Sequence, residues 1–404
     1  MQLRCSNETC HKEFALHDRS LACPRCGDLL ELQVGEVAAP AELKRVWLER
    51  RKSYAPEDAS GVWRFREFLP EGYGEVISLG EGNTPLVKGN KTAAWAGVRD
   101  IRFKHLGWNP TACFKDLGMT VGITEAKHVG AKAVGCASTG NTAASLAAYA
   151  ARAGLVAKVY LPAGKISTNK LAQSLDFGAE VVQVNGNFDF ALETLLSQSQ
   201  DEIYFLNSVN PFRIEGQKTA MFEVMEQLEW SVPDYLFVPG GNLGNSSAFG
   251  KAFDEMKASG LIERAPKIVI VQAEGANPLA RMWRSGASEL TPDDHPETIA
   301  TAIRIGNPRS WKKALRAVKH SGGFVMDVTD EEIGVAKAMI GRDGMGCEPA
   351  SATTLAAIRK LRGEGKLDPD AKVVAVLTGH ALKDTEYIIK SQHNGAREEA
   401  EVRS

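Results

Sequence analysis

The 404-residue sequence has no apolar run that approaches the length of a membrane span. Its first ten residues, MQLRCSNETC, contain no hydrophobic stretch of the kind that secretion signals carry. Internal repeats and low-complexity tracts are missing as well. These absences argue against a membrane protein, an exported protein and a repeat protein, and we expect a cytoplasmic location.

An excess of charge of either sign is also missing. The chain has 48 basic and 50 acidic residues, which gives a formal net charge of −2 at pH 7. This balance supplies no long-range attraction for nucleic acid or for an anionic membrane. Because 44% of the residues are hydrophobic, a chain of this length can build large cores and is expected to form two or more domains. The expected partner is a small molecule.

Cysteine is scarce over most of the chain. Beyond the first 26 residues there are only Cys113, Cys136 and Cys347, which are too scattered for a disulfide framework. The other four cysteines belong to two short motifs, CSNETC and CPRCG. Four thiolates could close a tetrahedral structural zinc site. The predicted ligands are Cys5, Cys10, Cys23 and Cys26.

Two alternatives to a four-cysteine site stay open. The cysteines of the first pair are four residues apart rather than two, so His11 or His17 could replace one ligand. In the second alternative, the segment is a reduced hairpin whose cysteines pack without a metal. Neither motif suggests a catalytic metal with an open position. The stretch AELKRVWLERRKSY that follows is expected to form an exposed basic helix with a solvated face.

From about residue 100 onward, apolar runs rich in valine and isoleucine alternate with longer helical patterns, which is typical of parallel sheets with crossover helices. The expected strands are AVGCAS, LVAKVYLP, EVVQVNG, IYFLNS, YLFVPGG, KIVIVQAE and KVVAVLTG. The expected helices are NTAASLAAYAARAG, STNKLAQSLDFGA, RIEGQKTAMFEVMEQL and EPASATTLAAIRKLRGEG. The fold class is therefore α/β, with doubly wound parallel or mixed sheets.

In open parallel sheets, ligands bind beyond the carboxyl ends of the strands, so the polar turns at those ends are the first candidates for a site. The turn CASTGNTAAS carries Ser138, Thr139, Asn141 and Thr142 around Gly140, before an alanine-rich helix. Backbone N–H groups and hydroxyls there could converge on an anion. An ordinary helix cap needs only one such residue. We therefore interpret this turn as a ligand site.

A second turn, VPGGNLGNSSAFG, has the composition of loops that cradle a phosphate on unpaired N–H groups. It lacks both the G-x-G-x-x-G order of dinucleotide folds and a Walker-type Gly-Lys-Ser/Thr ending, although the next strand ends in Glu274. A single cofactor phosphate fits the loop better. The predicted phosphate ligands are Gly240, Gly241, Asn242, Leu243, Gly244 and Asn245.

The stretch NPTACFKDLG places Lys115 between an aromatic residue and an acid, after a turn set by Pro110. Most lysines lie at the surface, but the apolar helix start behind this one favours an inward side chain. A desolvated lysine has a lowered pKa and can form a Schiff base. A third strand end, VLTGHALKD, adds the Thr378 hydroxyl. An aldehyde anchor, a phosphate cup and a partner for a ring nitrogen together indicate pyridoxal 5'-phosphate.

Nine motifs occur in the order found in threonine synthases, and from about residue 76 to about residue 385 the chain resembles that family of tryptophan-synthase-β-like, fold type II enzymes. The motifs are LGEGNTPL, NPTACFKDLGMT, CASTGNTAAS, LPAGKIS, NSVNPFRIEGQKT, VPGGNLGN, TAIRIGNPRSW, EPASA and LTGHALKD. Several belong to the whole superfamily, whereas NSVNPFRIEGQKT and TAIRIGNP are more particular to threonine synthases. The CPRCG segment is similar to the N-terminus of some microbial members.

The resemblance implies a role for each predicted cofactor residue. Lys115 would bind the aldehyde as a Schiff base and would shuttle protons between substrate carbons. Asn141 would hydrogen-bond the phenolate oxygen, the 240–245 loop would hold the phosphate, and Thr378 would face the pyridine nitrogen. Because a hydroxyl does not enforce protonation of that nitrogen, the cofactor would be a tempered electron sink.

The implied substrate is O-phosphohomoserine, which loses phosphate from its γ-carbon and takes up water at its β-carbon to give threonine. Its carboxylate would lie on the turn formed by residues 138–142. Its phosphate would be met by polar groups that include an arginine, whose fork suits phosphate. These phosphate ligands would be Thr142, Asn207, Ser208 and Arg213. For Arg213, an ion pair with Glu215 on a helix surface is the alternative.

Other functions stay open at this point. A threonine or serine dehydratase would use the same cofactor parts, and a cysteate-synthase-like replacement on O-phosphoserine would keep even the phosphate site. A zinc-ribbon interaction module or a cofactor-binding protein is a further alternative, although binding alone needs no aldehyde anchor such as Lys115. Threonine synthases usually have Gly-Ser before their Phe-Lys pair, where this chain has Ala112 and Cys113. Cys113 would be either a reactive thiol or a small packed residue.

The motifs and the element pattern together predict the domain organisation. A zinc-ribbon-like segment, a helical linker, a large domain in two parts, a small α/β domain between those parts and a tail are expected. Their bounds are 1–35 for the ribbon-like segment, 36–75 for the linker, 76–125 and 215–385 for the large domain, 126–214 for the small domain and 386–404 for the tail. The resemblance also implies a homodimer.

Overall fold

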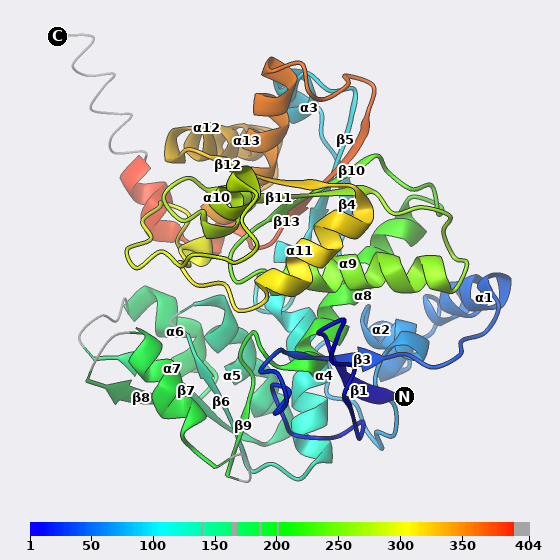
Figure 1. The fold of residues 1–404 in the computed structure, drawn as a ribbon, viewed down its shortest axis with the longest axis vertical. Helices are drawn as coiled ribbons and strands as arrows, with labels where there is room; N and C mark the ends of the chain where they lie inside the picture. The colour runs from blue at the N-terminus through cyan, green and yellow to red at the C-terminus, as the bar shows by residue number, and fades with distance from the viewer. Residues whose placement is uncertain (139, 164–167, 186–187, 200–201, 392–404) are drawn as a thin grey trace.

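The computed structural model describes residues 1–138, 140–163, 168–185, 188–199 and 202–391. These residues form three sheets. A six-stranded and a four-stranded sheet form two lobes, and a small N-terminal sheet lies beside their junction (Figure 1). The structure thus has the α/β architecture with two parallel-sheet units that the sequence predicts.

The larger sheet has the strand order β12-β11-β10-β13-β5-β4. Its strands are parallel, except that β4 pairs antiparallel with β5 at one edge. The bounds are β4 (Leu86–Lys88), β5 (Asp100–His105), β10 (Tyr235–Pro239), β11 (Lys267–Ala273), β12 (Phe324–Val328) and β13 (Lys372–Leu377). Central strands such as β10 and β11 are buried on both faces, which explains their continuous apolar sequence.

Helices cover both faces of the larger sheet, and each face has its own hydrophobic core. On one face lie α8 (Pro211–Gln227), α9 (Gly244–Ala258), α10 (Pro278–Ser285) and α11 (Trp311–Ser321). On the other lie α3 (Lys91–Ala96), α12 (Asp330–Arg342) and α13 (Pro349–Gly363). Short 3-10 turns join several of these elements: η2 (Leu106–Trp108), η3 (Thr301–Ile303) and η4 (Ala381–Lys383).

The smaller sheet is parallel throughout and has the strand order β8-β7-β6-β9. Its strands are β6 (Ala133–Ala137), β7 (Val156–Pro162), β8 (Glu180–Val184) and β9 (Ile203–Phe205). One face packs on α4 (Lys115–His128), α5 (Asn141–Ala153) and α6 (Thr168–Asp176). The other face packs on α7 (Phe188–Leu196). All four strands of this sheet lie within residues 126–214.

The two lobes meet where α4 crosses α8 (Figure 1). The crossing brings backbone against backbone, because a Cβ atom on Gly216 would lie only 1.8 Å from the carbonyl oxygen of Leu117. Helix α8 begins at Pro211, and the side chain of Asn210 caps it by accepting from the N–H groups of Phe212 and Arg213. This close crossing holds the start of α4 and the start of α8 side by side.

The N-terminal sheet consists of β1 (Gln2–Cys5), β2 (Glu13–Phe14) and β3 (Leu30–Gln33) in the antiparallel order β2-β1-β3. It shares a hydrophobic core with α8, α9 and α11. Lys251 donates to the carbonyl of Leu32 at 2.7 Å, and Arg316 pairs with Glu31 at 2.5 Å. The segment is therefore anchored to the larger lobe.

The segment expected to be a helical linker contains α1 (Pro40–Arg50), α2 (Pro56–Ala59) and η1 (Trp63–Phe68). Charged residues of α1 face solvent as predicted, but Trp47 is fully buried and packs on Phe222 of α8. Trp63, Phe65 and Phe68 join the same core. The aromatic residues make this segment part of the packed structure.

All seven expected strands are present, as β6 to β11 and β13. Strands β4, β5 and β12 are not predicted from the sequence. β4 is a three-residue edge strand, and β5 alternates charged with apolar residues. β12, at the opposite edge, is only partly buried and carries Asp327. None of the three therefore shows a continuous apolar run. In the described part of the chain, no helix has the length and apolar character needed to cross a bilayer.

Candidate functional site

The turn before Lys115 is joined to the end of β13 by backbone hydrogen bonds. The N–H of Phe114 donates to the carbonyl of Thr378 at 2.9 Å, and the N–H of His380 donates to the carbonyl of Ala112 at 3.0 Å. Ala112 has a φ of +62°, which explains why a glycine would suit this position. Two segments that are distant in the sequence are therefore joined by their backbones next to Lys115.

Lys115 is partly buried, and its ammonium lies 4.0 Å from the centre of the Phe114 ring. Burial, together with the positive charge of Arg213, lowers the pKa of Lys115 to about 8. The neutral, nucleophilic form of the amine is therefore far more populated at neutral pH than in an ordinary lysine, although it is still the minority form. The inward position that the sequence predicts for this lysine agrees with that environment.

Asp116, the next residue, fixes the turn to helix α5. Its buried carboxylate accepts from the N–H and the hydroxyl of Thr111 at 2.7 and 2.6 Å, and from the hydroxyl of Ser145 at 2.6 Å. Burial raises the pKa of Asp116 to about 6. Three donors on one carboxylate hold α5, which begins at Asn141, in register with the lysine turn.

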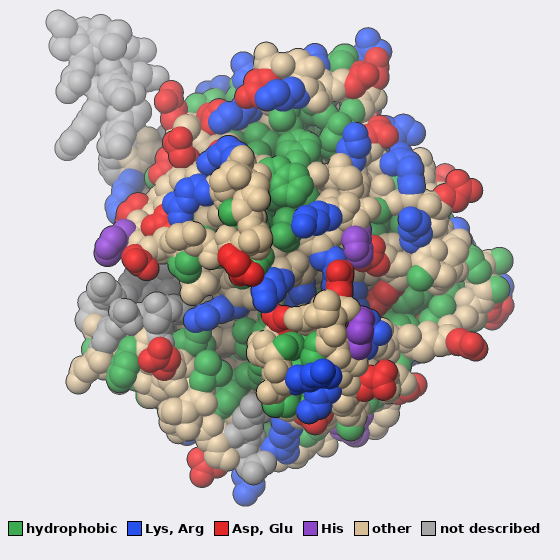
Figure 2. All heavy atoms as spheres, in the orientation of Figure 1, with side chains coloured by type: hydrophobic (Ala, Val, Ile, Leu, Met, Phe, Trp, Pro, Cys, Tyr) green, Lys and Arg blue, Asp and Glu red, His purple; other side chains and the backbone are tan. Residues whose placement is uncertain are grey.

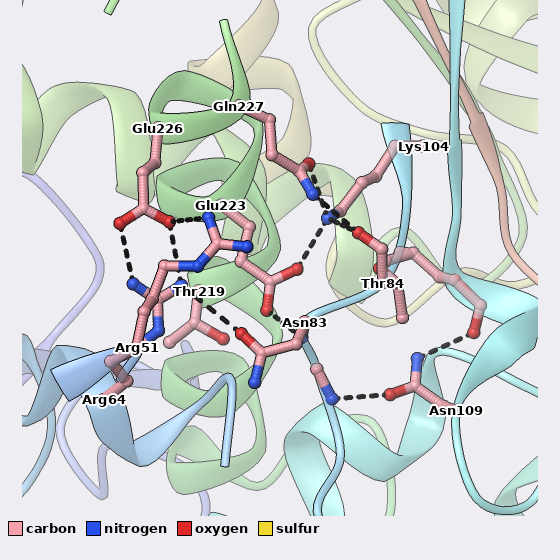
Figure 3. A network of polar contacts seen from close by, with 12 residues as sticks. Arg51, Arg64, Asn83, Thr84, Lys104, Asn109, Thr219, Glu223, Glu226 and Gln227 are labelled. Carbon is pink, nitrogen blue, oxygen red and sulfur yellow. Dashed lines mark hydrogen bonds and ion pairs between the residues drawn. The ribbon is translucent and has the colours of Figure 1, made fainter. Parts of the chain in front are cut away.

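A larger polar network supports the turn from the side of α8 (Figure 3). Asn109 accepts from the N–H of Gly82 at 2.8 Å, which ties the lysine turn to the GNTP loop. The buried carboxylate of Glu223 in turn accepts from the N–H of Asn83 at 2.5 Å and pairs with Lys104 at 2.6 Å. Figure 3 shows that the side chains of Lys104 and Glu223 point toward each other between β5 and α8. The network therefore fixes the backbone of residues 82–83 and of the turn that precedes Lys115.

The structure brings Asn141 and Thr378 to one carboxylate, that of Glu348. Oε2 of Glu348 accepts from the Asn141 amide at 3.0 Å, and Oε1 accepts from the Thr378 hydroxyl at 3.0 Å. Glu348 is 4% exposed, and burial raises its pKa. The EPASA motif contains Glu348, but the motif alone does not predict a role for this acid. Its place directly before a helix-starting proline was the available signal.

The 240–245 loop between β10 and α9 has open N–H groups. In the part of the chain that the structure describes, the backbone N–H groups of residues 241–245 have no backbone acceptor. The hydroxyl of Ser246 is also buried without a hydrogen-bond partner among those residues. A helix N-terminus with unpaired donors is suited to a phosphate, and Leu243, with a φ of +64°, turns the chain into it.

Gly240 leaves no room for a side chain, and Gly241 leaves little. A Cβ on Gly240 would lie 2.7 Å from the Ile270 side chain, and one on Gly241 would lie 3.1 Å from Ile303. Ile303 belongs to the TAIRIGNPRSW motif, and the backbone N–H of Arg309, farther along that motif, donates to the side chain of Asn242 at 3.0 Å. This motif therefore supports the loop formed by residues 240–245, a role that the sequence did not reveal.

The predicted substrate residues lie around the start of α5 and α8. Ser138 accepts from the N–H of Gly140 at 3.2 Å, and Thr142 lies in the first turn of α5. Asn207 is buried and accepts from the N–H of Ala137 at 3.1 Å, so it also joins β6 to the end of β9. Ser208 is partly exposed next to it. Thr139 lies outside the described residues.

Arg213 is buried, with 2% of its surface exposed, yet it forms no ion pair within the described residues. One guanidinium nitrogen donates to the carbonyl of Leu206 at 3.0 Å, and Nε has no partner there. Glu215 pairs with Lys218 at 2.5 Å and with Lys251. The alternative of a surface ion pair between Arg213 and Glu215 is thus wrong, because this carboxylate is held by two lysines.

Cys113 lies beside the site but is not set up as a reactive thiol. It is fully buried, and burial raises its pKa to about 11. Its sulfur lies 3.6 Å from the hydroxyl of Thr111 and 3.8 Å from the carbonyl of Asn141. The small packed residue is the alternative that fits this environment.

The four N-terminal cysteines form one cluster that could hold a metal ion, because their sulfurs all lie within 4.8 Å of one another. The Cys5 and Cys26 sulfurs are 3.4 Å apart, and those of Cys10 and Cys23 are 3.7 Å apart. Ligands at about 2.3 Å around a tetrahedral zinc would be about 3.8 Å apart. His17 instead pairs with Glu125 at 2.9 Å, so the four-cysteine set is the one that the geometry favours.

Comparison with known proteins shows which family this site belongs to. A model of the pyridoxal-phosphate dependent enzyme family matches residues 77–379. The threonine synthase of Methanocaldococcus jannaschii is 44% identical over 396 residues, which cover 97% of this chain and 96% of the relative. The chain belongs to the threonine synthase family. It is accordingly a lyase that depends on pyridoxal phosphate and acts in amino-acid biosynthesis.

Other threonine synthases support the assignment. That of Methanosarcina acetivorans is 44% identical over 94% of this chain and 92% of its own length. Among solved structures, threonine synthase from Escherichia coli superposes with a TM-score of 0.70 at 19% identity, covering 96% of this chain and 90% of that one. A tomato threonine deaminase gives a TM-score of 0.65 at 19% identity and covers 87% of this chain and 92% of its own. At these identities the structures show only the shared fold type II.

Proposed function

We propose that this threonine synthase converts O-phosphohomoserine and water to threonine and phosphate at the site between Lys115, Asn141, Thr378 and Arg213. The observation that carries the choice of substrate is the buried guanidinium of Arg213. It lacks a carboxylate partner in the described part of the chain and is close enough to Lys115 to lower its pKa. A buried, unpaired cation beside the reactive amine calls for an anionic ligand.

The residues present fit pyridoxal phosphate. Open N–H groups at residues 241–245 and the unpartnered Ser246 hydroxyl suit its phosphate, and the lowered pKa of Lys115 suits its aldehyde. In this proposal Asn141 holds its phenolate oxygen and Thr378 meets its ring nitrogen. When bound, the cofactor supplies an electron sink that stabilises negative charge on the substrate carbons.

Each side chain then has a defined task. The Lys115 Nζ takes a proton from one substrate carbon and returns it to another, since its pKa of about 8 suits both directions near neutral pH. Arg213, with Thr142, Asn207 and Ser208, holds the departing phosphate. Ser138 and Thr142, which lie on either side of the start of α5, bind the substrate carboxylate. With the predicted bounds of 126–214 for the smaller lobe, Arg213 and Thr142 would belong to that lobe, and Lys115 and Thr378 would belong to the larger one.

Product analysis with three substrates tests this function. We expect the enzyme to release phosphate and form threonine from O-phosphohomoserine. Of the three substrates, only this one carries a phosphate on a γ-carbon, and Arg213 would hold that phosphate as it leaves. O-phosphoserine and threonine should be inert. Phosphate release from O-phosphoserine alone would transfer the assignment to a cysteate-synthase-like reaction, and 2-oxobutanoate from threonine would make the enzyme a dehydratase.

We further propose that the four-cysteine cluster binds zinc as a structural ion. Cys5 and Cys23 are both buried in the core that contains α8 and α9, so the ion would brace the N-terminal sheet on the larger lobe. The four thiolates leave no open coordination position, so the site has no catalytic role.

The Cys23→Ser variant is expected to lose one equivalent of zinc and to unfold at a temperature lower by about 5 °C or more. Zinc content by mass spectrometry and thermal unfolding measure both effects. His11→Ala is the matched control, because His11 lies outside the cluster and should leave zinc content unchanged. Zinc loss in the control, or full zinc retention in Cys23→Ser, would contradict the four-cysteine site.

The homodimer and the cytoplasmic location expected from the sequence stay predictions. Sedimentation of the purified protein would settle the first, and fractionation of the native cells the second.

A further inference from the structure

The motif LTGHALKD continues past the end of β13 into the 3-10 turn η4, whose last residue is Lys383. This turn is fixed at both ends. The side chain of His380 caps its start by accepting from the N–H of Leu382 at 3.2 Å. Directly after the turn, the carboxylate of Asp384 accepts from the hydroxyl of Thr301 at 3.2 Å. The backbone of Lys383 is therefore held in place on the larger lobe.

The ammonium group of Lys383 bridges the two lobes. On its own lobe it donates to the carbonyl of Thr111 at 3.2 Å, and across the junction it donates to the side-chain oxygen of Gln173 on α6. An ammonium has only donors, so the Gln173 amide must present its oxygen. Because both acceptors are neutral, the bond between the lobes is a charge-assisted hydrogen bond and not an ion pair.

The Thr111 end of this bridge lies on the turn that leads to Lys115. Thr111 is fully buried, and its N–H and its hydroxyl both donate to the carboxylate of Asp116. Its carbonyl accepts from Lys383. Every polar group of Thr111 thus has a partner, and the partner of its carbonyl is the group that also contacts the smaller lobe.

The Gln173 end of the bridge is fixed to the smaller lobe. Two other side chains of α6, Leu171 and Ser174, are buried, and Leu171 belongs to the hydrophobic core between the smaller sheet and its helices. Gln173 itself is only partly buried. Helix α6 therefore moves with the smaller lobe, and the bond between Lys383 and Gln173 limits how far that lobe can move from the lysine turn.

We propose that Lys383 is a positioning residue: by binding Thr111 and Gln173 at once, it holds the smaller lobe close to the lysine turn. The predicted phosphate ligand Asn207 lies on the smaller lobe, whereas Lys115 acts at the substrate carbons. The bridge sets the separation of these groups, so it acts mainly on the binding of substrate between the lobes. This inference rests on the proposed function, which supplies the substrate.

A double-mutant cycle on the two partners tests the bridge. Lys383→Met and Gln173→Leu should each raise KM for O-phosphohomoserine by about 10-fold, because each removes a hydrogen bond to a charged group. The double variant should be no weaker than Lys383→Met alone, since Gln173 then has no bridge left to lose. Lys390→Met is the matched control, because Lys390 is exposed and its removal should leave KM unchanged.

Gln173→Glu tests the same contact by strengthening it. A carboxylate would pair with the Lys383 ammonium, so KM should fall below the wild-type value. The kcat should fall with it, because the release of products requires the lobes to separate. A merely structural role of Gln173 would not lower both constants together.

Hydrogen exchange of the ligand-free protein gives a measurement that does not depend on the substrate. The amides of residues 171–176 should exchange about 10-fold faster in Gln173→Leu than in the wild type. Unchanged exchange and unchanged KM in Gln173→Leu would overturn the inference even if Lys383→Met failed to fold. So would losses that multiply in the double variant, because Lys383 would then act without Gln173. The proposed function fails separately, if the wild type forms no threonine from O-phosphohomoserine.

Discussion

Lys115→Ala is expected to lower kcat for threonine formation by at least about 10⁴-fold, since the same amine anchors the cofactor and moves the substrate protons. The purified variant should also lose the absorbance band near the visible edge that a lysine-bound cofactor gives. Lys127→Ala is the control on the same helix, because Lys127 is exposed and, among the described residues, pairs with Glu75 at the surface. Retention of the band in Lys115→Ala would place the anchor on another lysine.

The environment of Lys115 also predicts how fast the apo-enzyme captures its cofactor. Burial lowers the pKa of Lys115 from 10.5 to about 8, so the amine becomes neutral and reactive as the pH rises through about 8. The capture rate, followed by absorbance, should therefore increase between about pH 7 and pH 9 and then level off. A rate that keeps increasing through pH 10 would show an ordinary solvent-exposed amine.

Arg213→Met is expected to lower kcat/KM for O-phosphohomoserine by about 100-fold or more, because removing one partner of a buried charge pair costs about 3 kcal/mol or more. The thermal stability of the ligand-free protein should not fall. In the described residues the guanidinium has no acidic partner, so its removal eliminates an uncompensated buried charge. Steady-state kinetics and thermal unfolding of the same preparations separate these two effects.

Two further variants sharpen the test of Arg213. Arg213→Lys should not restore kcat/KM, since an ammonium cannot reproduce the planar fork that binds two phosphate oxygens. Arg152→Met, an exposed arginine on α5, should be neutral in both assays. A large loss of stability in Arg213→Met with normal kinetics would instead mean that the arginine serves the fold through its bond to Leu206.

The sequence predicts much of this molecule because its signals are local. Continuous apolar runs mark β10 and β11, since strands buried on both faces need apolar residues at every position. The turns that hold Asn141, Thr378 and residues 240–245 directly follow such strands, where a parallel sheet places its ligands. Four cysteines in two short motifs likewise predict their own cluster, which the structure shows.

Other features depend on residues that are distant in sequence. The sequence presents Glu215 as the neighbour of Arg213, but tertiary packing brings Lys218 and Lys251 to that carboxylate and leaves the arginine unpaired. The sequence of α1 predicts that its charged residues face solvent. It does not predict that Trp47 is buried, because that burial depends on a contact with Phe222 of α8. No sequence pattern encodes such partners, because each contact arises only when separate elements pack.

The sequence by itself therefore determined the fold class, the family and the turns that carry the candidate site. Only the tertiary structure decided which charges are paired, which are buried, and that Glu348 joins Asn141 to Thr378. The physical reason is that residue type and spacing set local conformation and burial preference. The pKa and hydrogen-bonding state of a side chain depend instead on neighbours that the fold brings together from distant parts of the chain.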